Sequence, residues 1–473
     1  MAALALIALS AWAFSSPVGS SPDDDFHLAS IWCSATAPSG SCTRHGADVT
    51  VPRWTVAAAR CFAFRNTIPA SCQSTAGLSG AGSTSAARAN IPWTYPPGFY
   101  LAMGVLAGDD VPASVYAMRV ANAAIVVAIL LLALGLAPPA VRQSGLLALL
   151  AVGGPLGWFL FASTNPSSWA VAGMLALTVA LLGALLEPDD RRALLLLVVA
   201  AAGWILCIAS RADAAAYAAV IALGIAIAAL LRPEAGRRRR IVFALVCAVA
   251  IVGALVVTAT AGQAHIGMGG GGAGRSAMPL GGDVRNVINL PYLLLGSIGF
   301  WGVGWLDTTF PQGLPILATL LLGGVLMLGL GRLPRWIAPA VVLGVGALVV
   351  LPMRVLHARG YSVGEFVQPR YMLPLLIACV VLVLAPPTAR GVLALSRLQA
   401  AATVAIVFAV YAVGLVVNAQ RYATGMGAAK FDISSSALWW STDRISPNQT
   451  VALGILACAG FLALAWRYLR PAG

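Results

Sequence analysis

Three consecutive aspartates and a histidine follow the first apolar segment, in the stretch SPDDDFHL at residues 21–28. Adjacent carboxylates raise one another's pKa unless a cation or a hydrogen bond intervenes. Such a cluster therefore binds a divalent metal, Mg²⁺ or Mn²⁺, or keeps one carboxylate as a proton acceptor. The candidate catalytic residues are Asp23, Asp24 and His27, with Asp25 as a substrate contact and with Asp23 and Asp24 as the ligands of any metal. The alternative is a charged cap that fixes the end of the first helix.

A second concentration of charge lies late in the chain, in the stretch MRVLHARGYSVGEFVQPRYMLP at residues 353–374. Guanidinium groups bind phosphate through paired hydrogen bonds and stay charged near lipid, so this segment suits a lipid phosphate. The alternative is that the arginine side chains only extend to the membrane surface. Two shorter polar segments, residues 163–169 and 210–214, contain Asn165 and the charged residues Arg211 and Asp213. Each of these residues could instead cap a helix. The candidate substrate-binding residues are Arg354, His357, Arg359, Glu365, Arg370, Tyr371, Asn165 and Arg211, with Asp213 beside the last.

Four of the eight cysteines lie within residues 33–72, namely Cys33, Cys42, Cys61 and Cys72. An even number in an oxidising compartment favours two disulfides. The nearest pairing joins Cys33 to Cys42 and Cys61 to Cys72, and the other two connectivities remain open. A zinc site made of His27, Cys33, Cys42 and His45 is the alternative, although its spacing matches no standard motif. The remaining cysteines, Cys207, Cys247, Cys379 and Cys458, lie in apolar segments and are expected to be small core residues.

The composition points to the elements that must position these residues. Hydrophobic residues make up 60% of the 473 positions and charged residues only 10%, which indicates a polytopic membrane protein associated with a lipid bilayer. We expect an all-α integral membrane protein of about 12 transmembrane helices (11–13) with a large first outer loop. The predicted spans are residues 1–16, 114–137, 145–163, 168–186, 193–209, 213–231, 241–261, 313–331, 337–352, 371–387, 399–418 and 450–467.

The formal net charge of +13 comes almost entirely from arginine, since Lys430 is the only lysine. The arginines are scattered between apolar runs instead of forming one stripe, which argues against nucleic acid as a partner and for a role in topology. Short arginine-rich loops stay cytoplasmic. Counting spans from the loop at 232–240 places every such loop inside only if residues 289–305 do not cross the membrane. The arginine-rich loops are residues 187–192, 232–240, 331–336 and 389–397.

The same count predicts three parts: a first transmembrane helix at 1–16, an extracytoplasmic loop at 17–112, and a multi-helix domain at 113–473. The last part has outer loops at 262–312, 353–370 and 419–448, so the candidate site residues gather on the outer face.

Within the first outer loop, the stretch SGAGSTSAARAN at 79–90 is expected to be flexible. The aromatic stretch IPWTYPPGFY at 91–100 predicts an interfacial belt of Trp93, Tyr95 and Tyr100, or else an aromatic platform under a sugar or a lipid head group. The glycine-rich segment 267–286 predicts a mobile loop with Arg275 and Arg285 as secondary phosphate contacts. No Walker motif, nucleophile elbow, HExxH or haem signature is present, so ATP-driven and serine-hydrolase functions lack support.

Five segments carry a resemblance to a known family: PDDDFHL (22–28), YPPGFY (95–100), MRVANA (118–123), STNPSSW (163–169) and QPRYMLP (368–374). Together they resemble the DUF2142 family of predicted bacterial membrane proteins, in a form typical of high-GC actinobacteria. The family's first outer loop carries Pro-Asp-Glu-x-x-His, which Asp23, Asp24 and His27 match with Asp24 in place of Glu. The family's late motif Gly-Arg-Tyr-x-x-Pro is matched by Arg370, Tyr371 and Pro374, with Pro369 in place of Gly.

The DUF2142 family is in turn similar to GT-C glycosyltransferases, which have many transmembrane helices, an acidic pair in the first outer loop and a polyprenyl-phosphate sugar donor. The resemblance implies that Asp23 is the base, that Asp24 is its partner or a metal ligand, and that Arg370 anchors the donor phosphate. His27 would orient the acids or contact the phosphate. The implied reaction is inverting transfer of a sugar to a cell-envelope glycan or lipid acceptor outside the bacterial plasma membrane. The alternative function is a non-catalytic transporter of lipid-linked glycans or an envelope polysaccharide assembly protein.

Overall fold

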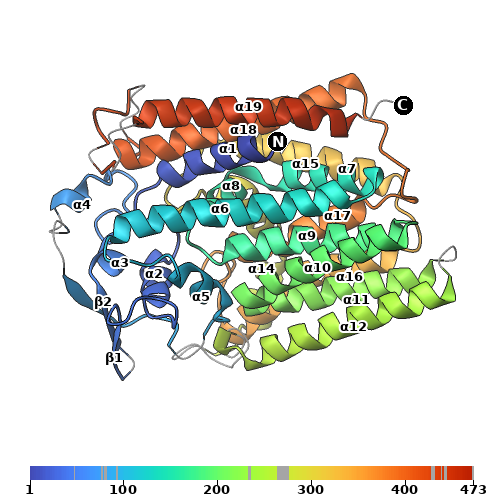
Figure 1. Cartoon of the computed structure of the whole chain (residues 1–473), viewed down its shortest axis with the longest axis horizontal. Helices are drawn as coiled ribbons and strands as arrows, with labels where there is room; N and C mark the ends of the chain where they lie inside the picture. The colour runs from blue at the N-terminus through green and yellow to red at the C-terminus, as the bar shows by residue number, and fades with distance from the viewer. Residues whose placement is uncertain are drawn as a thin grey trace.

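Long helices that lie side by side make up most of the protein (Figure 1). The computed structural model describes residues 1–46, 48–75, 78, 82–91, 94–232, 236–263, 276–427, 432–437, 439–440 and 445–470. The protein is an all-α polytopic membrane protein, as its composition predicts.

Nine helices of the described residues are long and apolar enough to cross a membrane. Each coincides with one of the predicted spans, because uninterrupted apolar runs of about 20 residues satisfy their backbone hydrogen bonds within one helix. They are α6 (Val111–Leu136), α9 (Ser167–Leu186), α10 (Asp190–Ser210), α11 (Ala212–Leu231), α12 (Arg237–Thr260), α15 (Gly313–Leu330), α16 (Ala338–Arg359), α18 (Arg397–Ala423) and α19 (Pro447–Leu469).

The other three predicted spans depart from straight, full-length helices. The first and tenth are the shorter apolar helices α1 (Ala2–Phe14) and α17 (Pro369–Val383). The span predicted at 145–163 is broken into α7 (Pro139–Val152) and α8 (Gly154–Phe161), which are bent by 99°. Gly154 has a φ of 43° and precedes a proline, so the helix cannot continue through this point. The prediction of one continuous span there was wrong.

Residues 353–359 form the last two turns of α16, although the sequence predicted that they belong to an outer loop. The helix ends where Gly360 adopts a left-handed conformation with a φ of 67°. The charged residues Arg354, His357 and Arg359 therefore lie on a helix and not on a loop. Charge near the end of a membrane helix does not stop the helix, since arginine has a good helix propensity.

The segment between α12 and α15 forms α14 (Leu280–Leu295) and a short π-helix, η1 (Gly296–Phe300). The N–H of Met278 donates to the carbonyl of His357 at 2.8 Å, and the hydroxyl of Ser297 donates to the carbonyl of Pro369 at 2.9 Å. His357 lies in the last turn of α16 and Pro369 begins α17, so both ends of α14 lie at the same end of the bundle. This segment therefore does not cross from one end of the bundle to the other.

The segment after α1 folds into a small subdomain at one end of the helix bundle (Figure 1). It contains α2 (Asp24–Trp32), α3 (Trp54–Ala57), α4 (Cys72–Thr75), α5 (Gly98–Gly104) and a three-stranded antiparallel sheet of β1 (Thr43–His45), β2 (Asp48–Pro52) and β3 (Ser83–Ala86) in the order β1-β2-β3. Strand β3 lies in the stretch that the sequence predicted to be flexible. That prediction was wrong for residues 83–86, because serine and threonine alternate there and pair with β2.

Two disulfides join Cys33 to Cys42 and Cys61 to Cys72, with Cα–Cα distances of 5.0 and 6.0 Å. The nearest pairing is therefore confirmed, and the alternative zinc site is excluded because two of its ligands are bonded to each other. The four remaining cysteines are free and buried, as expected.

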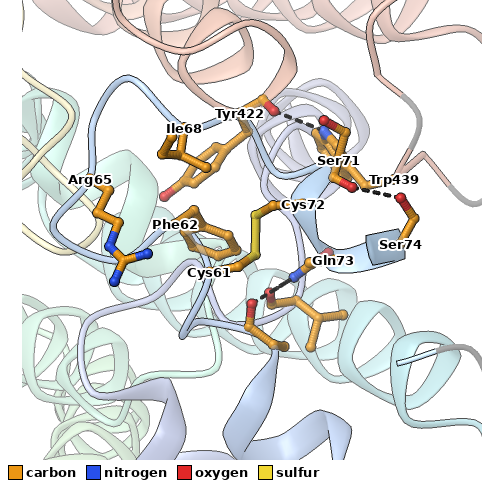
Figure 2. The surroundings of a disulfide bond; sticks show 12 residues. Cys61, Phe62, Arg65, Ile68, Ser71, Cys72, Gln73, Ser74, Tyr422 and Trp439 are labelled. Atoms are coloured by element: carbon orange, nitrogen blue, oxygen red, sulfur yellow. Dashed lines mark hydrogen bonds between the residues drawn. A yellow bond between two sulfur atoms is a disulfide. The ribbon is translucent and has the colours of Figure 1, made fainter. Parts of the chain in front are cut away.

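The loop closed by the second disulfide docks on the end of α18. Phe62 meets the Tyr422 ring edge-on, with 5.5 Å between the ring centroids (Figure 2). The buried guanidinium of Arg421 donates to the carbonyls of Phe62 and Ile68 and forms an ion pair with Asp307 at 2.8 Å. One fully buried arginine thus joins the subdomain, α18 and the segment after η1.

Contacts among the arginine-rich loops place several of them together at the other end of the bundle. Arg232 donates to the carbonyl of Leu185 at 2.6 Å, and its guanidinium lies over the Trp336 ring at 5.8 Å. The N–H of Ala140 donates to the carbonyl of Ala389 at 3.3 Å. We call this end the arginine-loop end and the end with the subdomain the site end. The prediction that the arginine-rich loops lie on one side of the membrane agrees with this arrangement.

Candidate functional site

Asp23 lies directly before α2 and has a left-handed backbone, with φ 58° and ψ 25°. Aspartate tolerates this conformation better than most residues. One carboxylate oxygen accepts a hydrogen bond from Nη2 of Arg370 at 2.5 Å, and the other accepts from Nη2 of Arg88 at 3.3 Å. The side chain of Asp23 keeps 26% of its surface exposed, whereas that of Arg370 keeps 3%. The acid is therefore accessible while the arginine approaches it from the interior.

Arg370 is held at the first turn of α17. Pro369 begins this helix, which suits its fixed φ, and its carbonyl accepts from Ser297. Nη2 of Arg370 also donates to the hydroxyl of Tyr371 at 3.1 Å. Nε of Arg370 and Oε1 of Gln368 are buried without a hydrogen-bond partner among the described residues. Both residues line a cavity of about 10 Å³, which is room for about one water.

Arg88 is a member of the site that the sequence interpretation missed. It follows β3 and donates to Asp23 and to Asp25, each at 3.3 Å, while its guanidinium lies 5.9 Å from the centroid of the Phe26 ring. Its side chain is 58% exposed, so it can exchange these partners for a ligand. One feature of the sequence could have identified Arg88: it lies in a predicted outer loop, whereas arginines tend to lie on the cytoplasmic side of the membrane.

Arg211 and two tyrosines form one wall of the site. The Arg211 guanidinium lies 4.3 Å from the centroid of the Tyr371 ring and 5.3 Å from that of Tyr95. It also makes a paired contact with Asp213, at 2.8 and 2.7 Å. The Arg370 guanidinium lies 4.9 Å from the same Tyr371 ring. The structure therefore places Arg211 and Tyr371, both candidates from the sequence, next to Arg370.

Asp24 occupies a different environment from its neighbour and is completely buried. Its carboxylate accepts from the Thr164 hydroxyl at 2.9 Å and from the Ser21 N–H at 3.0 Å, and it lies 3.8 Å from Nη2 of Arg119. Burial raises the pKa of Asp24 to about 6, although Arg119 and the hydrogen bonds oppose the shift. These buried contacts of Asp24 therefore anchor α2 inside the protein.

Arg119 completes this anchor and was also missed, although its segment MRVANA carried the family resemblance. The buried guanidinium donates to the carbonyls of Ala13, Ser16 and Pro17 and to the Ser20 hydroxyl, at 2.5 to 3.2 Å. These acceptors lie at the end of α1 and in the chain between α1 and α2. Asn165, a sequence candidate, supports the same turn through its side-chain amide, which donates to the Pro22 carbonyl at 3.0 Å.

Burial opposes ionisation of Asp23, but the positive charges of Arg370 and Arg88 outweigh that effect and lower the pKa of Asp23. Burial raises the pKa of Asp25, against the opposing charge of Arg88. Burial lowers the pKa of His27 to about 3, so its imidazole is neutral at physiological pH. Nδ1 of His27 shares a hydrogen bond with the Tyr100 hydroxyl at 3.0 Å.

The family model described as "Predicted membrane protein (DUF2142)" matches residues 6–380. The chain belongs to the DUF2142 family. The match includes Asp23 and Asp24 and the three arginines that pair with them, Arg88, Arg119 and Arg370. It ends before α18 and α19. Neither the curated proteins nor the solved structures include a match to this chain.

The other candidates of the DUF2142 protein take separate positions. His357 pairs with Asp283 at 2.9 Å, and Glu365 accepts from the N–H of Ser362 at 2.7 Å. Arg354 is exposed on α16, and Arg359 is its last residue. His357 and Glu365 are thus hydrogen-bonded to Asp283 and Ser362, and not to Arg370 at the start of α17.

The two tyrosines expected to lie in an interfacial belt belong to the site instead. Tyr100 is only 2% exposed, and burial raises the pKa of Tyr95 to about 12. Arg285 is exposed on α14. Trp93 and residues 267–275, which include Arg275, lie outside the described residues. The prediction of a mobile loop over 267–286 was wrong for residues 280–286, because they form the start of α14. The described part of the DUF2142 protein contains no group of three or more His, Cys, Asp and Glu side chains that could hold a metal.

Proposed function

We propose that this DUF2142 protein is a GT-C-like membrane glycosyltransferase that moves a sugar from a polyprenyl-phosphate donor to a cell-envelope acceptor. The contact between Asp23 and Arg370 carries the proposal, because it joins an acid of the first loop to an arginine 347 residues away. Glycosyl transfer from a lipid phosphate needs a proton acceptor for the incoming hydroxyl and a cation for the departing phosphate. These two groups lie side by side at a partly exposed point of the site end.

In the proposed reaction, the acceptor hydroxyl gives its proton to Asp23 as its oxygen forms a bond to the sugar C1. The bond between C1 and the phosphate oxygen breaks, and the lipid phosphate leaves with the electron pair. Arg370 and Arg88 then stabilise the additional negative charge on the phosphate. Attack from the side opposite to the leaving group inverts the configuration at C1.

The ion pair also links donor binding to the strength of the base. Arg370 lowers the pKa of Asp23 in the protein without donor, which makes the carboxylate a weak base. When the donor phosphate draws the guanidinium towards itself, that influence weakens and the pKa of Asp23 rises. Asp23 would thus become a better proton acceptor when the donor is bound.

The proposed location of the reaction is the outer face of the bacterial plasma membrane. Arginine-rich loops stay cytoplasmic, and the contacts of Arg232 and Ala140 gather such loops at the end opposite to Asp23. The two disulfides of the subdomain agree with an oxidising compartment on the site side.

A transporter or assembly protein would need polar groups available along the helices. Two buried polar side chains of the helices, Asn122 and Gln143, are instead engaged in hydrogen bonds to neighbouring segments. The amide of Asn122 donates to the Ser163 carbonyl and accepts from Nε1 of Trp169, and Gln143 donates to the carbonyls of Leu393 and Leu469. No observation on the described residues therefore favours transport over catalysis.

The test follows radiolabelled sugar from polyprenyl-phosphate donors into envelope acceptors, in membranes with equal amounts of wild type or Asp23→Asn. Asparagine preserves the shape but cannot accept the proton, so we expect transfer to fall by about 10² to 10⁴-fold. Asp48→Asn, an exposed aspartate of the same subdomain, is the matched control and should keep wild-type transfer.

Transfer by wild type and by Asp48→Asn but not by Asp23→Asn would support the enzyme and the role of Asp23. Equal transfer by all three proteins would remove Asp23 from the mechanism. If no donor supports transfer by the wild type, the glycosyltransferase proposal fails and a transport or assembly role becomes the better hypothesis.

A further inference from the structure

A cavity of about 230 Å³ lies within the helix bundle, apart from the candidate site. It is bounded by α1, α6, α7, α8, α18 and α19. Its lining is apolar except at a few points, and Arg142 is the only charged residue among those that line it. The lining includes Ala5, Ala8, Leu130, Leu149, Trp158 and Phe461.

The break between α7 and α8 accounts for this space. The 99° bend directs α8 away from the axis of α7, and residues of both helices line the cavity. Small residues on the neighbouring helices, Ala5 and Ala8 on α1 and Gly135 on α6, do not fill the gap. The cavity is therefore a consequence of the backbone and not of one rotatable side chain.

Water is a poor occupant of this space. One water needs about 10 to 15 Å³ of such volume and two to four polar partners, and apolar cavities of about 150 Å³ stay dry and bind apolar molecules. The cavity is larger than that and lies between helices that face a bilayer. A hydrocarbon chain is the apolar molecule that the surroundings supply.

Arg142 gives the cavity a polar end. Its Nε and Nη2 donate to the carbonyls of Leu134, Gly135 and Ala137, which fixes the guanidinium at the end of α6. Nη1 has no hydrogen-bond partner among the described residues, and the guanidinium lies 5.4 Å from the centroid of the Tyr468 ring. A fixed arginine with a free donor suits a phosphate group.

We propose that the cavity binds one acyl chain of an anionic phospholipid of the surrounding bilayer, with the lipid phosphate at Arg142. The chain extends from the arginine-loop end towards Trp158 and Phe161 of α8. The lipid is thus a bound component at the end of the bundle opposite to Asp23. This inference does not depend on the proposed glycosyl transfer.

Helix α8 connects the proposed lipid position with the candidate site. Helix α8 lines the cavity with Trp158 and Phe161, and the turn after it supplies Thr164, which donates to Asp24. Leu156 of the same helix lines the small cavity beside Arg370. A chain that fills the large cavity therefore packs against the helix that lies next to both parts of the site.

The test compares lipid retention by purified protein in mild detergent. Wild type, Ala5→Phe and Ala3→Phe are each incubated with deuterated dioleoyl phosphatidylglycerol or deuterated dioleoyl phosphatidylcholine, washed, and analysed for bound lipid by mass spectrometry. Ala5 lines the cavity, and Ala3 is exposed on the same helix and does not line it. We expect a stoichiometric amount of phosphatidylglycerol on wild type and on Ala3→Phe, and a loss of most of it on Ala5→Phe.

A second measurement separates lipid loss from misfolding. Added phosphatidylglycerol should raise the melting temperature of delipidated wild type and Ala3→Phe, since a ligand of the folded state stabilises it, but not that of Ala5→Phe. Without lipid, Ala5→Phe should melt at the wild-type temperature or above it, because the ring fills the space. Equal retention by wild type and Ala5→Phe, or no retention by wild type, would overturn the proposal.

Arg142→Gln tests the head-group contact and should abolish the preference for phosphatidylglycerol over phosphatidylcholine. Arg142→Lys keeps the charge and should keep that preference, even if loss of the cap on α6 lowers stability. If wild type shows no preference between the two lipids, the net charge of the head group does not matter and the proposed anionic lipid class is wrong.

Discussion

Asp23 and Asp24 are adjacent in the sequence and each meets an arginine, but the two ion pairs differ in kind. Asp23 is partly exposed, contacts Arg370 directly and also pairs with the exposed Arg88. Asp24 is fully buried, lies 3.8 Å from Arg119 and accepts two further hydrogen bonds. The guanidinium of Arg119 donates to four other acceptors, whereas that of Arg370 donates only to Asp23 and Tyr371 among the described residues.

The difference shows how identical side chains acquire different roles. A carboxylate that is completely enclosed by hydrogen bonds and a fixed arginine is suited to holding segments together. One that keeps an exposed edge and an exchangeable cation can take part in a reaction. Opposite shifts in pKa, downward for Asp23 and upward for Asp24, follow from the same contrast.

The largest effect on stability is expected for the buried pair. Arg119→Ala removes hydrogen bonds to the segment between α1 and α2 and leaves Asp24 buried without a cation, which should destabilise the protein by about 3 to 5 kcal/mol. The loss is measured as a lower melting temperature in detergent. Arg354→Ala, at an exposed arginine, is the control and should change stability by at most about 0.5 kcal/mol. Equal melting temperatures for both variants would contradict the assigned anchor.

The exchangeable pair should respond in binding and not in stability. Arg370→Lys keeps the charge but loses the geometry that allows contact with both Asp23 and Tyr371. We expect kcat/KM for the lipid donor to fall by about ten- to a hundredfold, the equivalent of one charge-assisted hydrogen bond. Donor titrations of wild type and variant give this ratio. An unchanged kcat/KM would show that the fork of Arg370 does not bind donor.

His27 sharpens the comparison through pH. The unfolded chain binds a proton at this histidine near pH 6.5, whereas the folded protein does so only near pH 3. Stability from His27 is therefore complete above pH 6.5 and is lost as pH falls towards 3, by about 2 kcal/mol at pH 5. Melting temperatures of wild type and His27→Gln between pH 4 and 8 test this. Asp24 contributes a pH dependence of stability with the opposite sign, but both proteins share it, so it cancels in their difference. Parallel curves would mean that His27 is not buried in its neutral form.

Arg88 should have the smallest effect. Exposed ion pairs contribute up to about 1 kcal/mol and are screened by salt, so Arg88→Ala should reduce transfer by at most about fivefold. The acid limb of the pH–rate profile should move to higher pH, since one charge that lowers the pKa of Asp23 is gone. High salt should shrink the difference between variant and wild type. A loss comparable to that of Asp23→Asn would make Arg88 a catalytic residue in its own right.

Most of the fold could be predicted from the sequence because membrane helices are encoded locally. An apolar run long enough to cross the bilayer must form a helix, and α9, in which every residue is buried, illustrates this. The bend at Gly154 and the short helices α1 and α17 could not be predicted from hydropathy. Apolar composition does not distinguish a straight span from a broken one when both are buried.

The sequence by itself determined the fold class and the disulfide pairing favoured by spacing, and it singled out Asp23 and Arg370 as candidates. Only the tertiary structure decided that Asp23 and Asp24 face different surroundings. The left-handed turn at Asp23 directs the two carboxylates apart, and their partners come from distant helices and loops. Hydrogen bonds and burial between segments far apart in the chain leave no local signal, so Arg88 and Arg119 became visible as partners only in the folded protein.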